Sequence, residues 1–484
     1  MKREVKYLLT LLCLAFFAVS CEKEPNGGEN GGEKPPPSPS VITLAKKEMR
    51  AVWIATVWGI DWPQELYNEA AQKKKYTDYL DKFVECNVNA VFVQIRPTAD
   101  AFYNSSYESW SKSITSVAGK DPGYDVLAFM IAEAHARNIE FHAWMNPYRI
   151  STRSGATVAF PALDPKIPSE LVKDYNTIRI YNPALPEVQD RLVSIVKDLI
   201  GKYDVDGVHF DDYFYPDPAS YTTPDDAAEY AKYGAGYTSV EAFRRGNVDK
   251  VIQKIYQTIV TDKPGVIFSI SPTANNEYNY NSLYADVTKW CQEGWMDVVI
   301  PQIYVATGAA TSNFNYRVSW WSQYCYKAVP MVGYALYKFG DATAGALFQT
   351  TAELENQFRL AHAQSKIMGS VMYSATYFNS NLLGIINILK SQIYPNPAVR
   401  PFLGRKTLGD PSPVSGVSLS GSSLKWSTGS DLRTVIYKLD ADKKGSVVAI
   451  TSAKEYTLPS RGTYCLTTVN KDNSESAVSE VITY

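Results

Sequence analysis

The chain has 484 residues, 45% hydrophobic and 13% aromatic, which is enough apolar surface for more than one domain core. Its formal net charge of -2 argues against nucleic acid or an anionic membrane face as the main partner. No Cys-x-x-Cys spacing or His-rich cluster occurs, so neither a zinc site nor a disulfide framework is indicated, and no cofactor is expected. Cys86, Cys291, Cys325 and Cys465 are expected to pack as small apolar side chains.

The N-terminus has the pattern of a secretory signal. Three basic residues precede an apolar stretch over residues 7–19, which is too short to span a bilayer comfortably. The sequence Ala-Val-Ser-Cys21 that follows resembles a bacterial lipobox, in which the cysteine becomes the lipidated first residue. We therefore expect residues 1–21 to be a lipoprotein signal and Cys21 a lipidation site. The lipid would then be the protein's only membrane attachment, at the outer membrane on its periplasmic or its exposed face. An ordinary signal peptide with a chance cysteine is the alternative.

Residues 22–44 are expected to form a flexible linker. Its first part, residues 22–40, is rich in Gly, Pro and Glu and has no apolar residue to bury.

Residues 45–395 alternate short apolar runs with amphipathic helical patterns. The expected strands are 50–57, 88–95, 139–145, 206–211, 266–271, 297–303, 329–335 and 370–374. The expected helices are 74–86, 126–137, 186–203, 240–260, 283–291, 316–326, 352–366 and 382–393. Eight strand–helix pairs predict an α/β fold of the (β/α)8 TIM-barrel type.

The composition changes after residue 395. Residues 396–413 contain several prolines and are expected to be a second linker. Residues 414–484 contain short alternating strands between Gly, Ser and Asp turns, which predicts a small β-sandwich similar to a fibronectin type III module. This module could bind sugar or act as a spacer; a spacer is favoured because no aromatic cluster stands apart from those that its core needs.

The segment 206–216 is the strongest functional signal. It ends an apolar run with two adjacent carboxylates, Asp211 and Asp212, where a parallel barrel displays catalytic groups. Strand alternation places His209 and Asp211 on the interior face. The two aspartates could instead cap the following turn. His209 could bond a carboxylate or a sugar hydroxyl, or it could be a buried neutral imidazole.

Polar and aromatic residues also follow the other expected strands. Such groups stack on pyranose rings and hydrogen-bond hydroxyls, so a carbohydrate ligand is expected. With His209, the candidate substrate-binding residues are Trp58, Asp61, Arg96, Trp144, Asn146, Arg149, Tyr213, Gln302, Tyr304 and Tyr334. The two arginines could pair with Asp211 and keep it ionised, or clamp loops.

Four ordered blocks carry a resemblance to a known family. Residues 49–63, 89–97, 141–149 and 206–216 resemble the bacterial glycosyl-hydrolase-like family ten, and the resemblance extends over residues 45–391. It implies a TIM-barrel glycosidase of the cell envelope, with the glycan strands of peptidoglycan as one substrate class. The C-terminal module lies outside this resemblance.

Glycoside hydrolysis normally requires two carboxyl groups. Asp211 is the expected nucleophile or charge stabiliser. Its partner could be Glu277, reaching across the cleft from the loop after the fifth strand, or Asp212, although extended backbone would point adjacent residues to opposite sides.

The fourth strand is also similar in outline to the chitinase signature, which ends in a catalytic Glu. In this sequence Tyr213 stands at that position. That departure counts against a chitinase but leaves open substrate-assisted hydrolysis of an N-acetylated sugar by the adjacent acids.

We therefore expect a monomeric glycoside hydrolase acting on an envelope or extracellular oligosaccharide or polysaccharide. The alternative is a non-catalytic glycan-binding lipoprotein that keeps the barrel and its aromatic mouth, since a fold does not establish a function. A pair of acids in one cleft favours hydrolysis.

Overall fold

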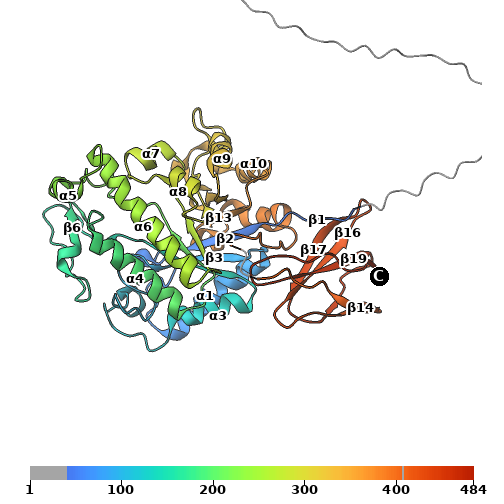
Figure 1. Cartoon of the computed structure of the whole chain (residues 1–484). Coiled ribbons are helices and arrows are strands. Elements are labelled where there is room, and N and C mark those ends of the chain that lie inside the picture. Colours follow the sequence, from blue (N-terminus) through green and yellow to red (C-terminus); the bar gives the residue numbers. More distant parts are fainter. Residues whose placement is uncertain (1–40, 406–407) are drawn as a thin grey trace, which may run out of the picture. The chain divides into compact units, whose positions relative to one another are not determined.

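The computed structural model describes residues 41–405 and 408–484. The expected signal sequence, Cys21 and most of the first linker lie outside these ranges. A parallel barrel forms the larger part of the described chain (Figure 1). Its strands are β2 (Met49–Ile54), β3 (Ala90–Arg96), β4 (Glu140–Met145), β8 (Gly207–Phe210), β9 (Ile267–Ile270), β10 (Val298–Val299), β11 (Val329–Pro330), β12 (Val332–Ala335) and β13 (Gly369–Tyr373).

The barrel closes through one continuous segment. The strand order is β11-β10-β9-β8-β4-β3-β2-β13-β12, with every pair parallel. The two end strands, β11 and β12, flank Met331 in a single stretch, which the sequence predicted as one strand. Both edges of the sheet therefore belong to the same segment, and the expected (β/α)8 barrel is confirmed.

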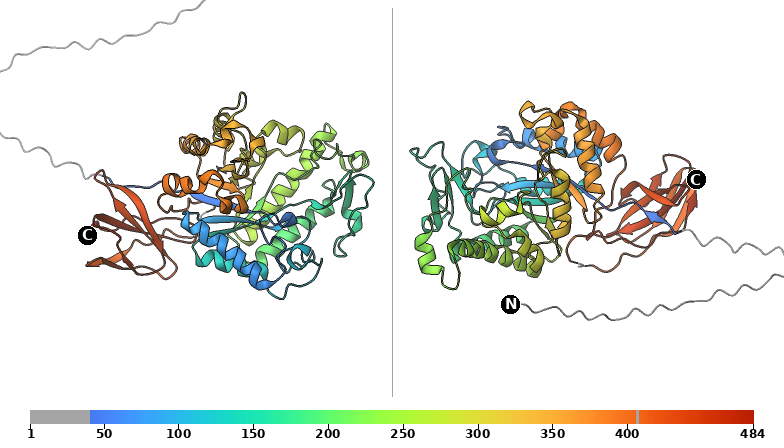
Figure 2. Two further views of the ribbon diagram at one scale, coloured as in Figure 1. Left: turned by 180° about the vertical axis from the view of Figure 1, so that it is seen from behind. Right: turned by 90° about the horizontal axis from the view of Figure 1, so that it is seen from above.

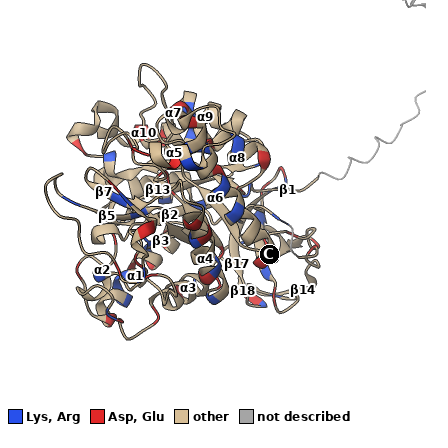
Figure 3. Ribbon diagram, turned by 60° about the vertical axis from the view of Figure 1, so that its left-hand side comes forward, with Lys and Arg blue, Asp and Glu red and all other residues tan. Residues whose placement is uncertain are grey.

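Helices surround the barrel, and two views from other directions show them outside the strands (Figure 2). The main ones are α1 (Glu69–Glu85), α3 (Val126–Ala136), α4 (Pro186–Lys202), α6 (Val240–Asp262), α8 (Val287–Glu293), α9 (Phe314–Tyr324) and α10 (Thr351–His362). Basic and acidic residues are interspersed along the outer helices α4 and α6 (Figure 3). In the part of the chain described, no helix is long and apolar enough to cross a membrane.

The closing helix differs from its prediction. The expected helix over 382–393 is three short pieces, η6 (Leu382–Gly384), α12 (Ile385–Ile388) and the π-type η7 (Leu389–Ile393). Leu383 and Gly384 have φ values of 54° and 75°. These left-handed conformations cannot continue a right-handed helix, so the regular helix is interrupted there.

The barrel strands are buried on both faces, which explains their continuous apolar runs. In β2, Ala51 and Trp53 belong to the core cluster inside the barrel, whereas Val52 and Ile54 belong to the cluster between strands and helices. This alternation follows the two-residue period of a strand. The position of each strand-end side chain, inside or outside the barrel, is thereby set by its register.

A small antiparallel sheet follows β4 and was not predicted. It consists of β5 (Arg149–Thr152), β6 (Val172–Tyr175) and β7 (Ile178–Tyr181), in the order β5-β7-β6. Each strand is four residues long, too short for a clear periodic signal. The sheet matters for function because β5 begins at Arg149.

The C-terminal residues form two β-sheets. One has the order β1-β17-β16-β19-β20 and the other β14-β15-β18. Their strands are β1 (Thr43–Leu44), β14 (Ser415–Ser420), β15 (Ser423–Ser427), β16 (Arg433–Leu439), β17 (Lys444–Thr451), β18 (Glu455–Thr457), β19 (Thr463–Val469) and β20 (Ile482–Thr483). A shared core that includes Trp426 and Leu466 packs the sheets against each other.

The C-terminal boundary of the expected linker over residues 22–44 shifts as a result. Thr43 and Leu44 pair with Lys444 and Gly445, so they belong to the C-terminal sheet and not to the linker over 22–44. The four expected apolar cysteines are free and buried, as predicted.

Candidate active site

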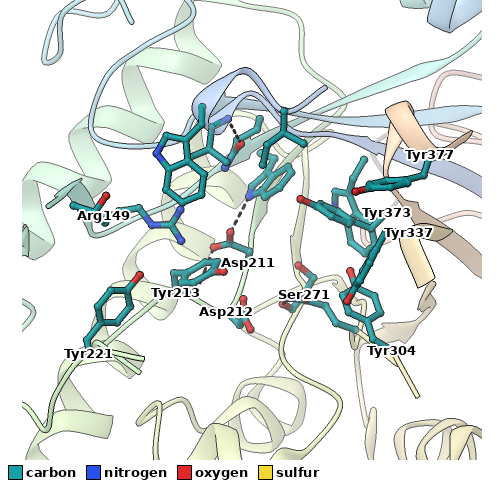
Figure 4. A pocket seen from close by; sticks show the side chains of 18 residues that line it. Arg149, Asp211, Asp212, Tyr213, Tyr221, Ser271, Tyr304, Tyr337, Tyr373 and Tyr377 are labelled. Atoms are coloured by element: carbon teal, nitrogen blue, oxygen red, sulfur yellow. Dashed lines mark hydrogen bonds between the residues drawn. The ribbon is translucent and has the colours of Figure 1, made fainter. Parts of the chain in front are cut away.

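A pocket of about 470 Å³ opens where the barrel strands end at their carboxyl termini. This is where TIM barrels place their active sites. The pocket is lined by Trp53, Val57, Trp58, Ile60, Gln94, Trp144, Arg149, Thr152, Asp211, Asp212, Tyr213, Tyr221, Ser271, Gln302, Tyr304, Tyr337, Tyr373 and Tyr377 (Figure 4). Asp211 and Asp212 are the carboxylates among these described lining residues.

Asp211 is held by two nitrogen donors. Trp144 donates its indole N–H to Asp211 Oδ2 at 3.2 Å, and Asn146 donates its amide N–H to the same oxygen at 2.6 Å. Both contacts occupy Oδ2, whereas Oδ1 accepts one long bond of 3.4 Å from the Tyr213 backbone N–H. Oδ1 is therefore the oxygen available for a proton or a ligand.

A chain of amides fixes Asn146 in the correct orientation. The backbone N–H groups of Thr56 and Val57 each donate to Gln94 Oε1 at 2.9 Å, and Gln94 Nε2 donates to Asn146 Oδ1 at 2.6 Å. A backbone N–H can only donate, so it determines which end of Gln94 faces it. Because the Gln94 amide nitrogen then faces Asn146 Oδ1, the amide nitrogen of Asn146 faces Asp211 and donates to it.

Asp212 lines the same pocket as Asp211, although strand alternation would have pointed it away. The reason is that β8 ends at Phe210, so the two aspartates lie in irregular backbone where the two-residue period does not hold. Figure 4 shows both carboxyl groups within the ring of labelled pocket residues. The structure therefore brings the two acids together.

Burial makes both acids harder to ionise. It raises the pKa of Asp211, and the neighbouring Asp212 carboxylate raises it further. Burial likewise raises the pKa of Asp212. Arg149 opposes both shifts through its positive charge, and its guanidinium lies 3.9 Å from the centroid of the Tyr213 ring. A pair of this kind can hold a proton near neutral pH, as acid–base catalysis requires.

His209 lies beneath the pocket. Trp53 donates its indole N–H to His209 Nε2 at 3.2 Å, which makes Nε2 an acceptor and places the ring proton on Nδ1. Nδ1 lies 2.8 Å from Ser269 Oγ, and burial lowers the pKa of the imidazole well below its usual value. Of the two alternatives, the structure has the buried neutral imidazole, and His209 supports the pocket from below.

Tyrosines form another part of the wall. Ring centroids lie 6.0 Å apart for Tyr304 and Tyr337, 6.2 Å for Tyr337 and Tyr373, and 6.0 Å for Tyr337 and Tyr377. Figure 4 shows this cluster facing the side of the pocket that holds Asp211. The pocket therefore combines aromatic rings, on which a sugar can stack, with acids that can transfer a proton.

Besides His209, three predicted binding residues are structural instead and do not line the pocket: Asp61, Arg96 and Tyr334. Asp61 is fully buried and accepts from the Ala55 backbone N–H and from Ser374 Oγ. The turn after β2 directs it back into the protein. Asp61 therefore holds two strand ends together and does not line the pocket.

Arg96 is a second correction, because it is fully buried and forms an ion pair with Glu108. A register shift between Gln94 and Arg96 breaks the alternation that would otherwise put both inside the barrel. Arg96 therefore clamps loops, as one of the two alternatives stated, and does not pair with Asp211.

Tyr334 and Glu277 also lie elsewhere. Tyr334 packs against Phe358 with ring centroids 4.3 Å apart, in the core between strands and helices. Glu277 is exposed in the first turn of α7 (Asn276–Asn281) and lines a separate depression with Tyr316. The expectation that Glu277 reaches across the cleft as the second acid is therefore not what the structure has.

The remaining predicted binding residues, Trp58, Trp144, Arg149, Tyr213, Gln302 and Tyr304, line the pocket, and Asn146 lies directly behind Asp211. The prediction missed Gln94, Tyr221 and Tyr373. Gln94 carried a signal, because it is a lone amide in the apolar strand β3, and Tyr373 ends β13. Tyr221 sits in a long loop, where no sequence pattern indicates a direction.

A family model and two named relatives match the part of the chain that holds this site. A family model described as glycosyl hydrolase-like 10 matches residues 48–344, which include all four sequence blocks. The chain is 39% identical over 377 residues to the protein named Glycosyl hydrolase YngK of Bacillus subtilis, covering 73% of each chain. It is 31% identical over 409 residues to Glycosyl hydrolase DigH of Escherichia coli K12, covering 76% of this chain and 92% of that one.

A solved structure, the glycoside hydrolase domain of PgaB (BpsB) from Bordetella bronchiseptica, matches at 11% identity with a TM-score of 0.47, covering 72% of this chain and 98% of that one. This likeness is too distant to bear on function.

Proposed function

The chain belongs to the glycosyl hydrolase-like 10 family, and on that premise we propose that it hydrolyses glycosidic bonds in N-acetylated amino-sugar chains of the cell envelope. The glycan strands of peptidoglycan are the substrate of this class that the family resemblance favours. The observation that carries the proposal is the pair Asp211 and Asp212, adjacent in the chain and lining one aromatic pocket.

The placement of the acids supports substrate assistance. A two-sided mechanism requires carboxyl groups on opposite sides of the sugar. Here the two acids follow one another on a single loop, and Glu277 lines another depression. The acetamido oxygen of the substrate would then act as the nucleophile in place of a protein carboxylate.

Each acid has one role in this scheme. Asp212 donates its proton to the glycosidic oxygen as the acetamido oxygen attacks the anomeric carbon and the C–O bond breaks. Asp211 Oδ1 accepts the acetamido N–H and stabilises the positive charge that develops on the resulting ring. Water then attacks the anomeric carbon, gives a proton to Asp212 and restores the acetamido group.

The contacts support this division. Two nitrogen donors hold Asp211 Oδ2, so its orientation is preset. Burial raises the pKa of both acids, and the charge of Asp212 raises that of Asp211 further, so the pair shares a proton near neutral pH. A substrate acetamido N–H that donates to Asp211 Oδ1 would favour the ionised form of Asp211 and leave the proton on Asp212.

The experiment compares substrates with and without the acetamido group. The full-length protein should hydrolyse peptide-free glycan strands or chitooligosaccharides, retain the anomeric configuration, and be inhibited by a thiazoline analogue of the cyclised intermediate. Equal hydrolysis of a matched glycan with a hydroxyl in place of the acetamido group would reject substrate assistance. Binding without any turnover would favour the non-catalytic alternative.

We further propose that lipidation at Cys21 anchors the protein in the cell envelope. The support is the lipobox-like sequence, which lies outside the described residues.

A further inference from the structure

A second pocket of about 490 Å³ adjoins the active-site pocket. Two loop regions line most of it, within residues 97–119 and 150–167. Three residues, Val57, Trp58 and Thr152, line both pockets. The two cavities therefore meet along a shared border.

Trp58 stands on that border with its side chain 73% exposed. A large exposed apolar ring is informative, since burial is the favoured state of tryptophan. Its backbone is nevertheless held: the Val57 N–H donates to Gln94 Oε1 at 2.9 Å, and the Gly59 N–H donates to Thr56 O at 2.9 Å. A fixed backbone with an open indole provides a platform for the apolar face of a ring.

The second pocket has the chemistry of a sugar-binding groove. Trp110 provides another aromatic surface, while Asp100, Asp164, Lys112 and the neutral hydroxyl of Ser109 provide hydrogen-bonding groups. The charged lining residues are two aspartates and one lysine, so the pocket is weakly acidic and a neutral polyhydroxyl chain suits it better than a strongly anionic one.

We propose that the two pockets form one cleft that binds a glycan chain of several sugars across Trp58, so that the enzyme cleaves within chains. This inference rests on the proposed function and adds the length of the substrate to it. Sugars in the second pocket contribute binding energy that positions the bond beside Asp211 and Asp212.

The test measures binding and turnover against chain length, with the full-length protein and chitooligosaccharides of two to six sugars. Calorimetric titration of Asp211→Asn measures affinity without hydrolysis. Affinity should rise with length, and Trp58→Ala should reduce the affinity for the hexamer by about tenfold, the size expected for one lost aromatic stacking contact. Tyr67→Ala is the matched control, because Tyr67 is 49% exposed and lies outside both pockets.

A second variant blocks the new pocket alone. Ala162 is exposed and lines only the second pocket, so Ala162→Trp should lower kcat/KM for the hexamer while leaving hydrolysis of an aryl glycoside of one sugar unchanged. The proposed cleft would be overturned by equal affinity for oligomers of every length or by no binding of any oligomer. It would also be overturned if neither Trp58→Ala nor Ala162→Trp changed binding or turnover of the hexamer. Length-dependent binding without hydrolysis would reject the proposed function and leave the cleft intact.

Discussion

Asn146 donates an N–H bond of 2.6 Å to Asp211 Oδ2, and its own oxygen accepts from Gln94. Gln94 lies in β3, Asn146 follows β4 and Asp211 follows β8, and these three strands are neighbours in the sheet. The orientation of the Asp211 carboxyl is thus set by a residue two strands away. Preset orientation of an acid avoids reorganisation during the reaction. Three of the predictions below concern this pair or its neighbours.

Gln94→Leu should lower kcat more than it changes KM. Leucine keeps much of the side-chain volume but removes the bonds to Thr56, Val57 and Asn146, so Asp211 loses its fixed direction. We expect a loss of about 100-fold in kcat, the size typical of a small misplacement in an active site. Steady-state kinetics measure this, and a thermal unfolding curve confirms that the variant is folded. An unchanged kcat would show that the amide chain does not position Asp211.

Asp211→Asn and Asp212→Asn should respond differently to the leaving group. An aryl glycoside with an acidic phenol needs little protonation, so Asp212→Asn should retain much of its turnover on it and lose several orders of magnitude on an oligosaccharide. Asp211→Asn should fail on both. Glu277→Gln serves as the matched acid control and should behave like the parent protein. A severe loss at Glu277 alone would restore the two-sided scheme.

The thermal stability of Asp211→Asn should depend on pH in a defined direction. Burial raises the pKa of Asp211 in the folded state above the unfolded value of about 3.9. The parent protein is therefore destabilised progressively as pH rises through the folded-state pKa, because ionisation is easier in the unfolded chain. Asp211→Asn has no acid to ionise at this position. At pH values above the folded-state pKa of Asp211, its Tm should therefore exceed that of the parent by on the order of 2 °C.

Near pH 3 the difference between the parent and Asp211→Asn should disappear, since the parent carboxyl is protonated in both states. A melting series from pH 3 to 9 makes the comparison. A variant that is less stable at every pH would contradict the assigned direction of the shift.

Arg96→Met should destabilise the fold, and because Arg96 also donates to the Asn146 carbonyl, any effect on activity should be indirect and fall on kcat rather than on KM. It leaves Glu108 buried and without its ion-pair partner, which costs about 3–5 kcal/mol in comparable cases. Urea unfolding measures the loss. Replacing Glu108 with leucine in the same variant should recover much of it. If Arg96→Met instead raised KM at unchanged stability, Arg96 would belong to the substrate site after all.

Cys21→Ala should block lipidation and change the fractionation of the protein. The expected product is an unprocessed or released form, detected by cell fractionation and immunoblotting. Ser20→Ala is a suitable control because it keeps a small residue before the cysteine. A Cys21→Ala protein that fractionates with membranes like the parent would remove the lipid anchor from the proposal.

The acid pair could be found without the structure because its position depends on local rules. Segment 206–211 is a buried run of strand length, and parallel barrels present chemistry at the carboxyl end of such strands. Asp211 therefore followed from the order of residues alone. The same rules predicted Asp212 to point away, and this was wrong because the strand had already ended at Phe210.

The sequence by itself determined the barrel, since strand-length apolar runs and helix-period patterns alternate eight times and each can be read within its own segment. Only the tertiary structure decided which strand-end residues meet. Trp58, Asp61 and Arg96 each follow the end of an expected strand. Trp58 nevertheless borders two pockets, whereas Asp61 and Arg96 are buried structural groups. A turn and a one-residue register shift separate these outcomes, because the direction of a side chain beyond a strand end depends on loop backbone and on partners far away in the chain.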